Sequence, residues 1–242
     1  MTESAFVFGS HSSRDFHLRV EKIPVIKMPA RKMSSISVPG RNGDLHIDEG
    51  AFENYTQPYE CYFHGPQAAP ELAHAIKAWL ASPGAYQRLE DTYDPAYFRH
   101  ATYAGPMDIS NILQRYGRCI INFDCAPQSF LKTGEQLLPF AAPGSLNNPT
   151  GFEAKPLIVV YGSGSGTVTI GDCTVTVREI RDQITLDCDL QHAYRQDGSA
   201  LPENANRCIY APTFPVLGAG ESVVSWTGDI THLEIAPRWW TL

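Results

Sequence analysis

The stretch Leu157–Val177, LIVVYGSGSGTVTIGDCTVTV, decides the fold class of this chain. β-Branched residues and threonines alternate on both sides of Gly171-Asp172-Cys173, as in two strands joined by a short turn. A dinucleotide site would need a helix N-terminus directly after the glycines, and a strand pattern follows them instead. We therefore predict a hairpin turn at Gly162–Gly166 and disfavour a nucleotide site.

The remainder of the second half has the same character. Strand patterns are predicted at Pro156–Tyr161, Gln183–Asp187, Ser222–Trp226 and His232–Ile235, with turn residues between them. No helical periodicity follows Pro127. Short strands separated by regular turns predict a β-sandwich.

The first half contains one predicted helix, residues 70–81. Its apolar residues recur at spacings of three and four, which gives one apolar stripe: Leu72, Ala75, Ile76, Trp79 and Leu80. Pro70 suits the first helical turn, and Ser82-Pro83-Gly84 ends the pattern. The helix is expected to lie on a sheet.

The rest of this half reads as strands and turns. The stretch Arg118–Cys125 alternates, with Cys119, Ile121 and Phe123 on one face and Ile120 on the other. Val38-Pro39-Gly40-Arg41-Asn42-Gly43 is a turn signature, in which Asn42-Gly43 is predicted to supply two positive φ angles. The polar run Asp44–Pro58 is interpreted as an extended loop or arm.

Composition changes at residues 126–150, which are rich in Pro and poor in charge. We interpret this segment as a linker. The chain is therefore expected to have two domains, residues 1–130 with the helix and residues 131–242 with the linker and the sandwich. The whole is predicted to be mainly β.

Composition also limits the function. The 242 residues are 43% hydrophobic, 19% charged and have a formal net charge of −7, which suits a globular protein and disfavours a general nucleic-acid surface. No apolar run is long enough for a membrane span. The six cysteines lack a Cys-x-x-Cys motif, and without a secretory leader they are expected to be free, buried thiols in a reducing cytoplasm.

Few residues suggest chemistry. The eight histidines are scattered, and no metal-ligand spacing or Gly-x-Ser-x-Gly elbow occurs. Asp187-Cys188-Asp189 places two carboxylates on one strand face near Asp182, where they suit a Ca²⁺ site, an acid/base pair or, more commonly, a solvated strand end. The aromatic residues of the second half suit sugar stacking or, more commonly, core packing and protein contacts: Tyr194, Tyr210, Trp226, Trp239 and Trp240.

Motifs spread over nearly the whole length resemble one known family. In order, they are Phe8-Gly9, Ser12-Ser13, Val38–Gly43, Tyr59–Phe63, Ala78–Leu80, Asp91–Phe98, Phe123–Pro127, Lys155–Leu157, Gly162–Gly164, Phe214–Leu217, Gly220 and Pro237–Trp239. In this set and order the chain resembles the distal tail proteins of siphophages. Glu221-Ser222 departs from the family pattern, in which Asn often follows the equivalent of Gly220.

The resemblance implies a structural virion protein without enzymatic activity or cofactor. It implies a hexameric ring at the distal end of the tail tube, formed by the N-terminal domain, with a galectin-like sandwich outside. The implied partners are further copies of the chain, the tail tube protein, the tail-tip hub protein and receptor-binding proteins, with DNA only passing through the lumen and no membrane. The implied location is the virion tail tip, after synthesis in the host cytoplasm.

We take a small set of turn and aromatic residues as candidate assembly-interface residues: Pro39, Gly40, Arg41, Asn42, Gly43, Trp239 and Trp240. Two alternatives remain. One is a galectin-like module that binds host-surface saccharide through Trp226 or Trp240. The other is a glycosidase that uses Asp182, Asp187 or Asp189.

Overall fold

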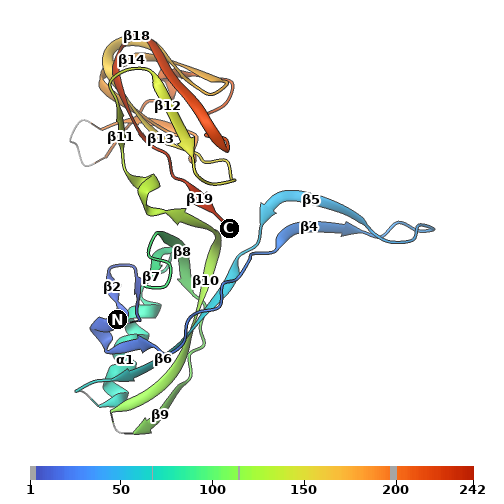
Figure 1. Cartoon of the computed structure of the whole chain (residues 1–242), viewed down its shortest axis with the longest axis vertical. Coiled ribbons are helices and arrows are strands. Elements are labelled where there is room, and N and C mark those ends of the chain that lie inside the picture. The colour runs from blue at the N-terminus through green and yellow to red at the C-terminus, as the bar shows by residue number, and fades with distance from the viewer. Residues whose placement is uncertain (1–3, 67, 114, 197–200) are drawn as a thin grey trace. The chain divides into compact units, whose positions relative to one another are not determined.

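A computed structural model of the chain describes residues 4–66, 68–113, 115–196 and 201–242. The chain divides into two compact units, Met1–Ser129 with Leu242, and Phe130–Thr241 (Figure 1). Strands dominate both units, and the described residues contain one α-helix. The fold class is therefore mainly β, as predicted.

The N-terminal unit consists of short and medium strands around the helix. Its elements are β1 (Phe6–Phe8), β2 (His11–Ser12), η1 (Ser13–Phe16), β3 (Leu18–Val20), β4 (Arg31–Ile36), β5 (Leu45–Phe52), β6 (Tyr55–His64), α1 (Ala69–Ala81), β7 (Gln87–Asp91), β8 (Tyr97–Tyr103), β9 (Ile109–Leu113) and β10 (Tyr116–Leu131), whose last two residues belong to the second unit.

One sheet organises this unit, in the order β2-β1-β7-β8-β10-β6-β3, with β9 also paired to β10. The alternation predicted for β10 is confirmed, because Cys119, Ile121 and Phe123 are at most 5% exposed whereas Ile120 is 51% exposed. One face of the sheet therefore belongs to the core, and the opposite face is open around Ile120.

The predicted helix is confirmed as α1. Leu72, Ile76 and Leu80 are buried in the core of the unit, but Ala75 is exposed and Ala73 takes the inward position. Trp79 attaches α1 to the sheet: its ring stacks on Phe6 and Phe16 with centroids 5.7 and 4.6 Å away. Its indole N–H donates to the carbonyl of Phe8 at 3.2 Å, so the polar atom of this buried ring is satisfied.

The C-terminal unit is built from three long strands and several short ones. Its elements are η2 (Lys132–Glu135), β11 (Leu138–Phe140), β12 (Gly144–Asn148), β13 (Leu157–Ile170), β14 (Cys173–Asp187), β15 (His192–Arg195), β16 (Glu203–Asn204), η3 (Asn206–Cys208), β17 (Ile209–Tyr210), β18 (Gly220–Ala236) and β19 (Trp240–Thr241).

The long strands β13, β14 and β18 each contribute to two layers. At one end they pair with one another and with β12 and β17, and at the other end with β11 and β15. Side chains of both ends, such as Val160 and Leu233 from one layer and Val168 and Val224 from the other, share one buried core. The result is the predicted sandwich, made by strands that bend over themselves.

The bend explains the glycines of Gly162–Gly166, and it corrects the prediction of a hairpin turn there. β13 continues through these residues, and the turn to β14 is Gly171-Asp172, because Ile170 pairs with Cys173. At the bend, β13 and β18 approach so closely that a Cβ on Gly162 or Gly166 would lie less than 3.0 Å from a carbonyl oxygen of β18. Glycine is required there by space, not by a turn or a ligand.

The linker interpretation of residues 126–150 is also wrong in its local structure. These residues form the end of β10, then η2, β11 and β12. β11 and β12 pair with the two ends of β18. Edge strands tolerate Pro at positions where no ladder hydrogen bond is needed. A Pro-rich segment can therefore form edge strands even though its composition resembles that of a linker.

Replacing Gly162 or Gly166 by Ala is expected to lower the free energy of unfolding of the C-terminal unit by about 1–3 kcal/mol, because the added methyl group meets backbone atoms that pairing holds in place. Urea unfolding followed by circular dichroism measures the change. Gly218→Ala is the matched control, since a Cβ there has no heavy atom within 4 Å. Equal effects for all three variants would contradict the steric argument.

Candidate assembly surfaces

The predicted interface residues Pro39–Gly43 lie at the tip of a two-stranded arm. The backbone N–H of Arg41 donates to the carbonyl of Val38 at 3.1 Å, and Gly40 between them has φ +81°. Proline at the second position and glycine with this φ at the third make a type II turn. The predicted pair of positive φ angles is corrected: Gly43 has φ +80°, but Asn42 does not have a positive φ.

The arm consists of β4 and β5, which pair with each other and with no other strand described (Figure 1). The loop predicted for residues 44–58 is therefore mostly strand: β5 pairs with β4 from Leu45↔Ile36 to Phe52↔Arg31. Polar side chains link the two strands. The Arg31 guanidinium contacts Asp48 at 2.6 Å, and Ser35 bonds His46 at 2.9 Å.

Asp48 adds to the order of the arm through its backbone contacts. The backbone N–H of Gly50 donates to the Asp48 carboxylate at 2.9 Å. The hydrogen bond from Gly50 has the largest effect and that from Arg31 the next largest, and both lower the pKa of Asp48 below its usual value. The arm is thus a paired hairpin with side-chain contacts across and within its strands.

Exposed hydrophobic side chains concentrate in the arm and in the segment that leads to it. Of the eighteen large hydrophobic side chains that are exposed among the described residues, nine lie between residues 23 and 47: Ile23, Val25, Ile26, Met28, Met33, Ile36, Val38, Leu45 and Ile47. Exposed apolar side chains in such density mark surfaces that bind another molecule.

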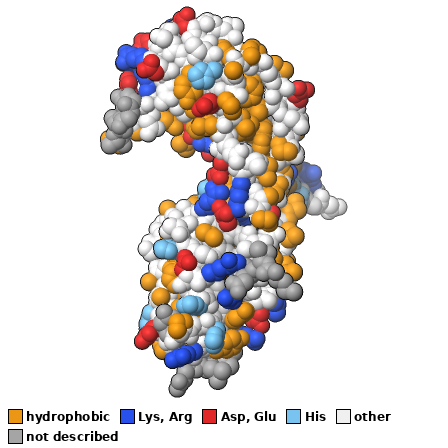
Figure 2. Space-filling view, turned by 60° about the vertical axis from the view of Figure 1, so that its left-hand side comes forward, with side chains coloured by type: hydrophobic (Ala, Val, Ile, Leu, Met, Phe, Trp, Pro, Cys, Tyr) orange, Lys and Arg blue, Asp and Glu red, His pale blue; other side chains and the backbone are white. Residues whose placement is uncertain are grey.

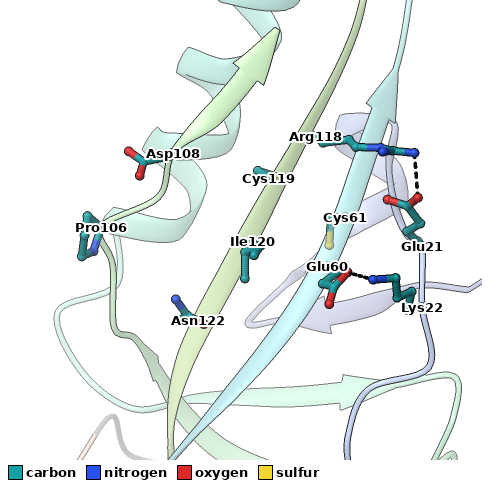
Figure 3. A pocket seen from close by; sticks show the side chains of 10 residues that line it. All are labelled: Glu21, Lys22, Glu60, Cys61, Pro106, Asp108, Arg118, Cys119, Ile120 and Asn122. Atoms are coloured by element: carbon teal, nitrogen blue, oxygen red, sulfur yellow. Dashed lines mark hydrogen bonds and ion pairs between the residues drawn. The ribbon is translucent and has the colours of Figure 1, made fainter. Parts of the chain in front are cut away.

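A groove lies on the open face of the N-terminal sheet, opposite the helix side (Figure 3). We call it the outer groove; it has a volume of about 710 Å³. Ile120 and Asn122 of β10 line its middle. On one side are two ion pairs, Arg118–Glu21 at 2.8 Å and Lys22–Glu60 at 2.5 Å, and on the other are Pro106 and Asp108.

Trp239 and Trp240, the other predicted interface residues, belong to the C-terminal unit and not to the arm. Trp239 is 6% exposed, and its carbonyl accepts from the N–H of Leu131 at 2.8 Å. Trp240 is partly buried, stacks on Phe152 with centroids 4.5 Å apart, and donates its indole N–H to the carbonyl of Glu153 at 2.9 Å. Both rings fasten the end of the chain to its own unit.

The structure separates the acidic residues that suggested a metal or acid/base site. β14 ends at Asp187, which is 6% exposed and accepts two hydrogen bonds from Arg238 at 2.8 and 3.0 Å. Asp189 lies in the following turn, where it is exposed and contacts Lys155 at 3.3 Å. The prediction that Asp187 and Asp189 share one strand face is therefore wrong, because the strand ends between them.

Other candidate chemistries find little support in the described residues. No three His, Cys, Asp or Glu side chains gather there in a group that would hold a metal ion. All six cysteines are free, and burial raises the pKa of Cys119, Cys125 and Cys188 to about 12, which removes their nucleophilic thiolates at neutral pH.

Surface charge is mixed, and the described helix is too short for a bilayer. On the face shown in Figure 2, basic and acidic side chains are interspersed, so this face has no continuous basic track of the kind that binds nucleic acid. No helix among the described residues is long and apolar enough to cross a membrane.

The fold has a known counterpart among solved structures. No family model and no curated protein matches the sequence. The chain is similar in structure to the SPP1 Dit (gp 19.1) protein, with a TM-score of 0.73 at 10% sequence identity over 99% of each chain. That protein is described as a paradigm of the hub adsorption apparatus in phages that infect Gram-positive bacteria. The two chains share the fold along their whole length.

The Asp187–Arg238 pair predicts a pH dependence of stability. Burial acts to raise the pKa of Asp187, but the hydrogen bonds from Arg238 and from the backbone of Leu190 and Asp189 outweigh it and lower that pKa. A lowered folded-state pKa stabilises the fold above the unfolded value near 4, and this stabilisation is lost as the pH falls through the folded-state pKa.

Asp187→Asn is therefore expected to destabilise the C-terminal unit by about 1–3 kcal/mol at pH 7 and to flatten the acid limb of its stability curve. Urea unfolding between pH 2 and about 7 measures both effects. Asp189→Asn, two residues away and exposed, is the control and is expected to change little. An unchanged acid limb in Asp187→Asn would refute the assignment.

Proposed function

We propose that this protein is a structural component of a bacteriophage tail that assembles into a ring at the distal end of the tail tube. Two observations support the proposal. The fold is similar to that of the SPP1 Dit protein over 99% of each chain. The exposed apolar arm is a surface that a single copy leaves uncovered.

The arm suits contact between copies of the chain. The eight residues of β5, at about 3.3 Å per residue, give the arm a reach of roughly 25 Å, enough to cross onto a neighbouring subunit. An arm that binds a different surface of the next copy makes a head-to-tail contact, and such contacts close into rings when the rotation between copies permits. We propose six copies per ring, as in the family that the sequence resembles.

The ring is proposed to act as an adaptor. In this arrangement it joins the tail tube protein to the tail-tip hub protein, holds receptor-binding proteins and lets DNA pass through its lumen. This role needs no catalysis. The one buried carboxylate among the suggested acid/base residues, Asp187, is engaged by Arg238 in holding the C-terminal unit together.

Saccharide binding by the C-terminal sandwich has weaker support. The aromatic residues proposed for it make contacts within their own unit: Trp226 packs partly against the core, and Trp240 stacks on Phe152. Sugar stacking needs a free ring face.

Removing the arm is expected to abolish assembly. The N–H of Glu53 donates to the carbonyl of Ala30 at 2.8 Å, so Gly-Gly in place of residues 31–52 closes the chain without strain. Sedimentation velocity and negative-stain imaging are expected to give rings of six 26.8-kDa chains for the full protein and monomers for the shortened one.

A second pair of variants tests whether assembly depends on the apolar side chains of the arm or on exposed apolar side chains in general. Ile36→Ser with Leu45→Ser removes one exposed apolar cross-strand pair of the arm, and Val223→Ser removes a more exposed valine of the C-terminal unit. Assembly is expected to weaken only in the first. Rings formed by the chain without its arm would contradict the proposed role of the arm.

A further inference from the structure

The outer groove has the chemistry of a protein-binding surface. Its floor includes Ile120, a half-exposed isoleucine in the middle of an ordered strand. Its volume of about 710 Å³ falls in the range typical of binding sites. A strand face with Ile120 beside Asn122 at its floor and charged side chains at its rim resembles the anatomy of a protein–protein interface.

Among the described residues that line the groove, the charges are balanced except at one position. Glu21 is paired with Arg118, and Glu60 with Lys22, on one wall. On the opposite wall, Asp108 has no hydrogen-bond or ion-pair partner among the described residues. A ligand that fits this groove is therefore apolar on the side that faces Ile120 and carries one cation for Asp108.

The tip of the arm has these properties. It is a narrow type II turn that exposes Val38 and, directly after the turn glycine, Arg41. The Arg41 guanidinium has no partner among the described residues. Arg41 is the only charged residue between Ile36 and Gly43.

We propose that the outer groove of one copy receives the arm tip of a second copy, with Arg41 paired to Asp108 and Val38 against Ile120. The proposal rests on the proposed assembly into a ring and identifies the receiving surface. Because arm tip and groove are different surfaces of one chain, each copy gives its arm to one neighbour and accepts an arm from the other. This is the head-to-tail geometry from which rings are built.

Charge reversal in the full chain tests the pairing. Arg41→Glu and Asp108→Arg are each expected to weaken association at least about tenfold, because each places two like charges in contact at the proposed interface. The double variant restores opposite charges across every contact and is expected to recover most of the loss. Lys77→Glu, the same charge change on the exposed face of α1, is the control.

A cross-link provides a second readout that does not depend on ring stability. Copies with Val38→Cys are mixed with copies with Ile120→Cys under mild oxidation by diamide. The proposed contact of Val38 with Ile120 predicts a disulfide-linked dimer of the two variants. Five of the six native cysteines are buried, which limits competing disulfides.

The outcomes separate this inference from the proposed function. One outcome is that the unchanged chain forms rings while neither charge reversal weakens association and the mixture does not cross-link. In that case the groove is not the receiving surface, but the proposed ring is still supported. If Arg41→Glu weakens association and the addition of Asp108→Arg does not restore it, the proposed pairing is also wrong. A chain that neither assembles nor cross-links overturns the ring and the pairing together.

Discussion

The C-terminal unit depends on one steric constraint: β13 and β18 approach more closely than any side chain allows. Gly162 and Gly166 on β13 face Gly228 and its neighbours on β18, and a Cβ on any of the three would lie less than 3.0 Å from a backbone oxygen. Glycine at these positions lets both strands bend together and pass from one layer to the other. The apolar faces of the same strands then fold onto each other and form one core.

The N-terminal unit divides its apolar side chains between two uses. The stripe of α1 is buried on the sheet, with Trp79 stacked between Phe6 and Phe16. The arm instead exposes its apolar side chains on an ordered hairpin whose cross-strand contacts, such as Arg31 with Asp48, hold it in shape. An arm that is already paired as a hairpin has less conformational entropy to lose on binding than an unpaired loop has.

The buried carboxylate that suggests catalysis or metal binding in the sequence has a structural role in the fold. Asp187 accepts from Arg238, a residue with φ +57° in the tail that leads to Trp239. Together with the two Trp rings, this pair fastens the C-terminal end to the sandwich. A carboxylate engaged in this way is not open to a substrate, as a catalytic carboxylate must be.

The sequence alone determined what local periodicity encodes: α1, the alternation around Ile120, the turn at Gly171 and the mainly β class. These follow from contacts between residues close in the chain. Tertiary structure alone decided which strands pair and where the glycines and prolines are used. A glycine needed for close approach to β18 looks the same in sequence as a turn glycine, and the strand potential of residues 45–52 becomes visible only beside β4. The ion pair between Arg118 and Glu21 at the groove likewise joins residues 97 positions apart, and it depends on strand pairing that no local pattern records.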